Sequence, residues 1–391
     1  MWSLASVLAL ALFGDGDRSV WTPALPSAPL TAGLRPRAVG TEEILYVNFD
    51  GGVLLAGCGN EAHYNCSTLA DVFDGYIGPF TGNDNQRISI LQATRKTLAD
   101  FGVRVTVARP PADVDYTMVM YGDLGPQDFA GVAPYIDCED VHANDTSFCA
   151  AFDTSNTGST VILQEAAHTW GLEHVDAEFD VLNPFKSSGI RQSFTDECHR
   201  IVSNTDLQPT AGSCNQVHTR FCETGYQNSY QEMKYLFGDA VPDITAPELV
   251  ITSPVEGESY VLPITVPLLG EITDDLDPQF YHIEISVITD DGELPLMERD
   301  DVNLDLLLEN PPADDYELRV VIADEAGNRD EARVSFTILP EGSELPADDE
   351  DEIIEDGGEE CGIAGRRGAL PLLLVGLLTR RRRAGRATGR R

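Results

Sequence analysis

One stretch of eleven residues, QEAAHTWGLEH from Gln164 to His174, constrains the fold more than any other part of the chain. Gln164 and His168 are four residues apart, so on an α-helix their side chains share one face, about one turn apart. Gly171 can end such a helix, because glycine readily adopts a left-handed conformation. The spacing therefore predicts a helix that ends at a glycine bend.

This arrangement resembles the H-E-x-x-H-x-x-G-x-x-H motif of the metzincin zinc metallopeptidases. Glu165, His168, Gly171 and His174 stand at matching positions, whereas Gln164 replaces the first histidine. The resemblance implies that His168 and His174 are zinc ligands and that Gln164 is a poor third ligand. It also implies that Glu165 is the general base, which takes the proton of a zinc-activated water during peptide-bond hydrolysis.

Two departures from the motif affect this interpretation. Zinc favours imidazole nitrogen or thiolate over a neutral amide oxygen, so Gln164 should weaken zinc binding by orders of magnitude. A distant histidine could replace the missing ligand; the candidates are His63, His142, His199 and His218. Leu182 occupies the place of the family's turn methionine, and this change roughly conserves volume, at a cost below about 1.5 kcal/mol.

The resemblance leaves alternative functions open. The chain is either a secreted zinc endopeptidase that acts on extracellular proteins or peptides, or an inactive metzincin scaffold that binds them. The glutamate at position 165 favours the first, and the glutamine at position 164 favours the second. A purely structural surface protein is a third alternative. The stretch could also be an ordinary amphipathic helix with exposed histidines.

The chain before the motif predicts a mixed α/β (α+β) domain over about residues 41–240, with a mixed twisted sheet and the motif on its active-site helix. Strands are expected at 43–49, 103–110, 116–122 and 131–136, and a helix at 86–101. The active-site helix is expected to start at 157–160. Trp170 is interpreted as a packing residue.

From about residue 244 the helical periodicity ends, and short Val-, Ile- and Leu-rich runs alternate with turns. This pattern predicts an all-β sandwich over residues 244–339. The stretches TAPELVITSP and ADEAGN resemble the immunoglobulin-like modules of bacterial surface proteins, which serve as spacers or binding modules. The acidic residues Asp274, Asp275 and Asp277 are either a calcium site or a solvated loop.

Both ends carry features of processing signals. The apolar run after Met1 predicts a signal peptide over residues 1–28, followed by a linker at 29–40. An acidic linker at 340–360 precedes Cys361, a short apolar run and an arginine cluster. This order resembles the myxobacterial C-terminal sorting signal (MYXO-CTERM) over residues 361–391. It implies export, recognition by sorting machinery and delivery to the cell surface or beyond. The apolar run is too short for a stable transmembrane span, although a weak tail anchor is the alternative.

Charge and cysteine content narrow the partners and the compartment. The net charge of −39 argues against nucleic acid as a partner, and a monomer is expected. The eight cysteines favour disulfides in an oxidising compartment. The close pairs are Cys58/Cys66, Cys138/Cys149 and Cys214/Cys222. Cys198 is left over or replaces a neighbour, so the pairing stays open.

Overall fold

The computed structural model describes residues 20–21, 40–152, 154–186, 190–203, 207–210, 212–289 and 292–345. Nearly all of the predicted signal peptide and first linker, most of the acidic linker and the whole sorting signal lie outside these ranges. Within the predicted signal peptide, only β1 (Val20–Trp21) is described. It pairs antiparallel with β9 (Phe185–Lys186).

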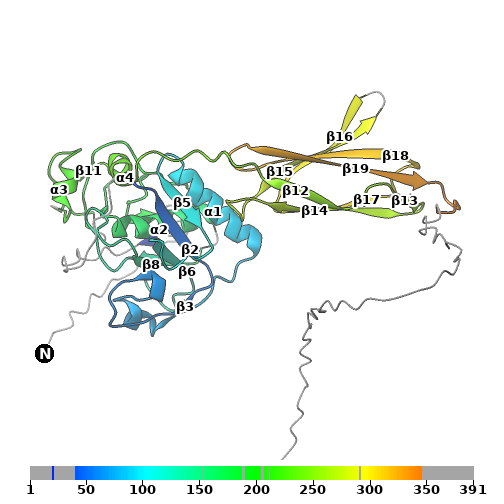
Figure 1. Cartoon of the computed structure of the whole chain (residues 1–391). Coiled ribbons are helices and arrows are strands. Elements are labelled where there is room, and N and C mark those ends of the chain that lie inside the picture. Colours follow the sequence, from blue (N-terminus) through cyan, green and yellow to red (C-terminus); the bar gives the residue numbers. More distant parts are fainter. Residues whose placement is uncertain are drawn as a thin grey trace, which may run out of the picture. The chain divides into compact units, whose positions relative to one another are not determined.

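The first part of the chain forms the predicted mixed sheet (Figure 1). Its five strands lie in the order β5 (Val103–Thr106), β2 (Glu43–Asn48), β6 (Thr117–Gly122), β8 (Thr146–Ala150) and β7 (Gly131–Val132). The first four strands are parallel, and β7 is an antiparallel edge strand. Strand β6 is buried along its whole length, as expected for a parallel strand with both faces covered.

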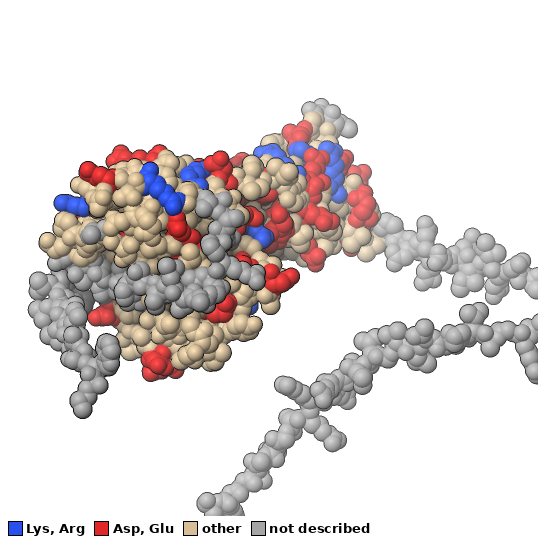
Figure 2. Space-filling model, turned by 60° about the vertical axis from the view of Figure 1, so that its left-hand side comes forward, with Lys and Arg blue, Asp and Glu red and all other residues tan. Residues whose placement is uncertain are grey.

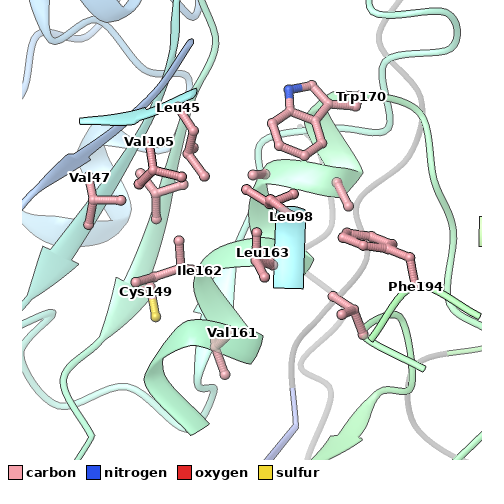
Figure 3. Close-up of a cluster of buried hydrophobic side chains, with 14 of the residues drawn as sticks. Leu45, Val47, Leu98, Val105, Cys149, Val161, Ile162, Leu163, Trp170 and Phe194 are labelled. Atoms are coloured by element: carbon pink, nitrogen blue, oxygen red, sulfur yellow. The ribbon is translucent and has the colours of Figure 1, made fainter. Parts of the chain in front are cut away.

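Helices α1 (Asp84–Leu98), α2 (Ser155–Thr169) and α4 (Ser229–Phe237) pack on one face of this sheet. Figure 3 shows Leu45 and Val105 of the strands on one side of this core and Leu163 of α2 on the other. Trp170 is 1% exposed and belongs to the same core, which confirms that it is a packing residue.

Shorter elements cover the opposite face of the sheet or lie in the connecting loops. They are η1 (Ala62–Tyr64), η2 (Ala70–Phe73), the pair β3 (Gly52–Val53) and β4 (Tyr76–Ile77), the pair β10 (His199–Arg200) and β11 (Tyr226–Gln227), and α3 (Asn215–His218). Phe73 packs against Phe148 of the sheet, with ring centroids 4.6 Å apart and the rings tilted by 48°. The sheet is therefore covered on both faces, and α2 lies in the interior.

Several expected boundaries were wrong. Helix α2 begins at Ser155, two residues before the expected start, because the side chain of Thr154 caps it by accepting from the backbone nitrogen of Thr157. The predicted strand at 131–136 is only β7, Gly131–Val132. Strand β8 was not predicted at all, although it lies between β6 and β7.

The second part is the predicted all-β sandwich. One sheet holds β12 (Glu248–Ser253), β14 (Thr265–Thr273) and β17 (Leu304–Glu309). The other holds β13 (Glu258–Val261), β19 (Arg329–Leu339), β18 (Asp314–Ala323), β15 (Tyr281–Thr289) and β16 (Gly292–Asp301). One apolar core joins residues of both sheets, including Leu268 and Val320, each fully buried.

Among the described residues, the cysteines form three disulfides, and one of them matches an expected close pair. Cys58 is bonded to Cys66 as expected. The other two bonds join Cys138 to Cys214 and Cys198 to Cys222, and Cys149 is a buried free thiol. The pair 138/149 was wrong, and in the Cys214/Cys222 pair Cys198 takes the place of Cys214, which was the open alternative. The disulfides fit an exported protein.

The surface matches the acidic composition. Figure 2 shows Asp and Glu side chains at many places and Lys and Arg at fewer. In the described ranges, no helix is both long enough and apolar enough to cross a membrane.

Candidate metal centre

Helix α2 ends at the expected glycine bend. Its last residue is Thr169, and Gly171 has φ +97°, a conformation that favours glycine. A Cβ at this position would lie 2.7 Å from the carbonyl oxygen of Asp137, so the glycine also permits a close backbone approach. The bend that the sequence predicts is therefore confirmed.

The bend brings the two motif histidines together. The Nε2 atoms of His168 and His174 lie 3.1 Å apart, and their ring centroids are 4.6 Å apart at an interplanar angle of 79°. Both side chains are buried, at 0% and 1% exposure. The histidines are therefore not merely exposed residues of an amphipathic helix, and that alternative was wrong.

A backbone contact fixes the tautomer of His168. Its Nδ1 lies 2.8 Å from the carbonyl oxygen of Leu172, which can only accept, so Nδ1 is the donor. In a neutral imidazole, Nε2 then carries the lone pair that faces His174. An Nδ1–H bonded to a backbone carbonyl is the usual second contact of a metal-ligating histidine.

Gln164 is fully buried one turn before His168. Its side-chain Nε2 donates to the carbonyl oxygen of Asn183 at 3.2 Å. Oε1 is then the only atom of this side chain that could bind a metal. The position is thus compatible with the neutral, weak ligand that the sequence predicts, and it supplies no third nitrogen.

The turn Asp180–Asn183, which contains Leu182, contacts the segments that carry the motif residues. The backbone nitrogen of Val175 donates to the Leu182 carbonyl at 3.1 Å, next to His174 in the chain. The turn therefore contacts α2 through Asn183 and the segment after the bend through Leu182. Leu182 itself is fully buried.

Asp180 organises this turn from a fully buried position. It accepts from the backbone nitrogens of Leu182, at 2.8 Å, and Thr195, at 3.0 Å. The hydroxyl of Ser229 also donates to it at 3.2 Å. Burial raises the pKa of the Asp180 carboxyl, although these hydrogen bonds oppose the shift.

Glu165 is also fully buried and lies against the edge strand β7. A Cβ added at Gly131 would lie 2.7 Å from its Cγ and 2.8 Å from its Oε1, so the glycine makes room for this side chain. Burial and the Glu165 carboxylate together raise the pKa of the Cys149 thiol well above its usual value. Glu165 therefore sits beneath the edge strand, one residue along α2 from Gln164.

The other candidate histidines have their own partners. His63 contacts Glu61 at 2.7 Å and the carbonyl of Val114 at 2.9 Å. His142 lies 3.1 Å from Asp137. His218 is held between two glutamates, Glu173 and Glu232.

His199 of β10 lines a cavity of about 600 Å³ beside the Asp180 turn. Its walls include Phe179, Phe194 and Tyr230. Among the described residues, the structure thus brings His168 and His174 together at the bend after α2, the helix that also carries Gln164 and Glu165, and it gives the four distant histidines other surroundings.

The acidic loop of the sandwich uses two of its carboxylates internally. Asp277 accepts from the backbone nitrogen of Asp274 at 2.9 Å, and Asp274 accepts from that of Leu276 at 2.8 Å. The carboxylates of Asp274 and Asp275 lie within 4.8 Å of each other and of that of Asp243. Calcium binding at this loop stays a prediction.

One charged network near the site was missed from the sequence. His218 bridges Glu173, the residue before His174, and Glu232 of α4. These residues are far apart in the chain, and their neighbours in the sequence are polar. No spacing therefore indicates that they meet.

Comparison with protein-family models and with curated proteins gives no match. Several solved β-domains are similar to part of this chain. The fibronectin(III)-like modules of CbhA from Clostridium thermocellum show 14% identity over 24% of this chain and 96% of theirs, with a TM-score of 0.21. The PKD1 domain of Epp from Vibrio anguillarum shows 11% identity over 25% of this chain and 99% of its own, with a TM-score of 0.18.

The PKD1 domain of the Vibrio cholerae metalloprotease PrtV shows 14% identity over 24% of this chain and 99% of its own, with a TM-score of 0.17. The strand pairing described above, rather than these likenesses, establishes the β-sandwich.

Proposed function

We propose that the α/β part is a metzincin-like zinc metallopeptidase domain that acts on extracellular proteins or peptides. The observation that carries the proposal is the 3.1 Å approach of the His168 and His174 Nε2 atoms in a buried site. The glycine bend supports it, because it follows the helix that carries Glu165 and His168 and leads to His174.

The donor set fits a weak zinc site. Tetrahedral zinc holds imidazole nitrogens at about 2.0–2.1 Å, which places two such nitrogens about 3.3 Å apart. The observed separation of 3.1 Å is close to this value. Gln164 would add an amide oxygen through Oε1, so the set is one imidazole short of the family's three. We therefore expect weak zinc binding.

Zinc bound there would supply a Lewis acid that polarises the scissile carbonyl and lowers the pKa of water. His168 and His174 would hold the metal, and the Leu172 carbonyl would keep His168 in the ligating tautomer. The Glu165 carboxylate would accept the proton of the attacking water and pass it to the leaving amine. Because the Glu165 side chain is buried against Gly131, its carboxylate would have few other groups to which it could pass that proton.

The flanking segments suggest where this domain works. The disulfides agree with export. We propose that sorting machinery recognises the tail at Cys361 and delivers the chain to the cell surface or beyond. The sandwich would then act as an immunoglobulin-like spacer or binding module.

A catalytically inactive binding scaffold is the second candidate function. The hydrogen bond from Gln164 to the carbonyl of Asn183 favours it, since the position accommodates an amide with a specific partner. Such a protein would recognise peptides without an effective metal.

Zinc content and casein cleavage test both candidates. The purified chain, equilibrated with zinc, should hold less than one zinc per molecule, and His168→Ala with His174→Ala should abolish this binding. Slow casein cleavage that Glu165→Gln removes without reducing zinc content would support the peptidase.

Zinc binding at these histidines without cleavage would favour the scaffold. Zinc content that does not respond to the two histidine substitutions would overturn the metal site. Full occupancy with ready cleavage would refute the expectation that Gln164 weakens the site.

A further inference from the structure

His174 lies beyond α2, in an irregular segment whose position depends on what anchors it. The residue before it, Glu173, is anchored through its backbone by the buried side chain of Gln227. The nitrogen of Glu173 donates to Gln227 Oε1 at 2.7 Å, and its carbonyl accepts from Gln227 Nε2 at 3.0 Å. The carbonyl of His174 accepts from the nitrogen of Val202 at 3.0 Å.

The side chain of Glu173 is anchored as well. Its Oε1 accepts from the backbone nitrogens of Ser213 and Cys214, the latter at 3.0 Å. It also lies 3.2 Å from Nε2 of His218. One carboxylate oxygen thus joins the His174 segment to α3, and the disulfide of Cys214 continues this connection to Cys138.

His218 links this segment to α4. Its Nδ1 lies 2.9 and 3.0 Å from the two carboxylate oxygens of Glu232. The side chains of His218 and Glu232 are 0% and 1% exposed, and that of Glu173 is 12% exposed. The three residues form one buried row of alternating charge.

A buried charge row fixes geometry more strictly than apolar packing does. Apolar cores accept other side chains of similar volume. Displacing one member of a buried ion network leaves a desolvated charge without its partner. Such a row next to a proposed ligand is suited to set that ligand's direction.

We propose that Glu173, His218 and Glu232 form a positioning triad that keeps the His174 imidazole facing His168. The triad acts through the backbone of residue 173 and touches neither the metal nor a substrate. The expected effect on zinc affinity rests on the proposed metal site. The expected effect on the orientation of His174 does not.

The test replaces two members of the triad by apolar residues in the full chain. His218→Leu with Glu232→Leu removes two members of the row while filling their space, and Glu173 keeps its hydrogen bond from the Cys214 nitrogen. Some stability should be lost with the charge row, so thermal unfolding first checks that the variant is folded. We expect zinc affinity to fall about 10- to 100-fold, as for other supporting contacts of metal ligands. The NMR signals of the His174 ring should shift or broaden, while those of His168 stay in place.

Asp145→Asn is the matched control. Asp145 is equally buried, accepts from Tyr135 at 2.6 Å and Asn60 at 2.8 Å, and lies on a different segment. It should leave zinc affinity and the His174 signals unchanged. If the double variant does not fold, Glu232→Gln, which keeps the shape and removes the charge, replaces it with the same readouts.

The outcomes separate the two proposals. Unchanged His174 signals in a folded triad variant would overturn the positioning role, whatever the zinc result. If the unmodified protein binds no zinc but the His174 signals move, the metal site fails and the positioning role stands. Equal changes in Asp145→Asn would show a general effect of replacing a buried acidic residue, which would also overturn the proposal.

Discussion

The side-chain nitrogen of Gln164 donates to the carbonyl oxygen of Asn183 at 3.2 Å and so ties helix α2 to the turn that begins at Asp180. His168 shows the same arrangement one turn later, where one side-chain nitrogen is bonded to the Leu172 carbonyl and the other faces the site. A histidine at position 164 could combine these two roles, because an imidazole has a second nitrogen. The amide offers only an oxygen.

Gln164→His should therefore raise zinc binding. We expect occupancy to approach one zinc per chain and affinity to rise by orders of magnitude, because a third imidazole completes the set that zinc favours. Mass spectrometry under native conditions and competition with a chromophoric chelator measure this. Gln164→Leu, similar in size but without a ligand atom, is the control and should bind no better than the unmodified protein. No gain in Gln164→His would show that the helix face is not directed at a metal.

The Cys138–Cys214 disulfide should stabilise the fold more than Cys58–Cys66. The first joins residues 76 positions apart and the second residues 8 apart. Loop-closure entropy then gives about 4–5 kcal/mol for the long loop and about 2.5 kcal/mol for the short one. Replacing each pair by alanines and measuring urea unfolding tests the difference. Equal losses would argue against an entropic origin.

The helix and its bend could be predicted because their signals are local. Gln164, His168 and Gly171 lie within three turns, and their spacing alone defines a shared face and a helix end. The strands at 43–48 and 117–122 also carry their own apolar pattern. These local signals predicted the glycine bend and the approach of His168 to His174 that the structure shows.

The remaining features depend on contacts between distant segments. Strand β8 has the short sequence TSFCA, which becomes a strand by pairing with β6 and β7. Strand β16 is mostly exposed, and its apolar side chains Leu294, Leu296 and Met297 lie on the surface, so it lacks the long Val- and Ile-rich run of its neighbours. The triad could not be predicted from the sequence either. Before folding buries them, Glu173, His218 and Glu232 resemble ordinary surface residues.

His218 should make stability depend on pH in the alkaline range. Burial would lower the pKa of His218, but its hydrogen bonds to Glu173 and Glu232 raise it to about 9, from an ordinary 6.5. The folded protein then holds the proton more tightly than the unfolded chain. The stabilisation is complete below about pH 6.5 and is lost as the pH rises through 9. It amounts to on the order of 3 kcal/mol.

Urea unfolding at pH 6, 7.5 and 9 measures this dependence. The unmodified protein should lose stability over this interval relative to the variant that carries His218→Leu and Glu232→Leu. Parallel pH profiles for the two proteins would mean that His218 does not hold a proton in the folded state.

Gly171→Ala should damage both the fold and the metal site. An alanine at φ +97° costs about 1–2 kcal/mol from backbone strain alone. Its Cβ would also lie 2.7 Å from the Asp137 carbonyl oxygen and 3.0 Å from the Cys138 Cα, both backbone atoms that cannot move cheaply. Relief of this clash should add about 1–3 kcal/mol and shift the segment that carries His174.

Gly57→Ala separates strain from contact. Gly57 has φ +82°, and nothing lies within 4 Å of a Cβ built there. It should show only the backbone cost and unchanged zinc affinity, whereas Gly171→Ala should lose clearly more unfolding free energy and weaken zinc binding. Urea unfolding and chelator competition on both variants test this. If the two substitutions had equal effects, the close approach of the bend to Asp137 would have no role in holding His174 against His168.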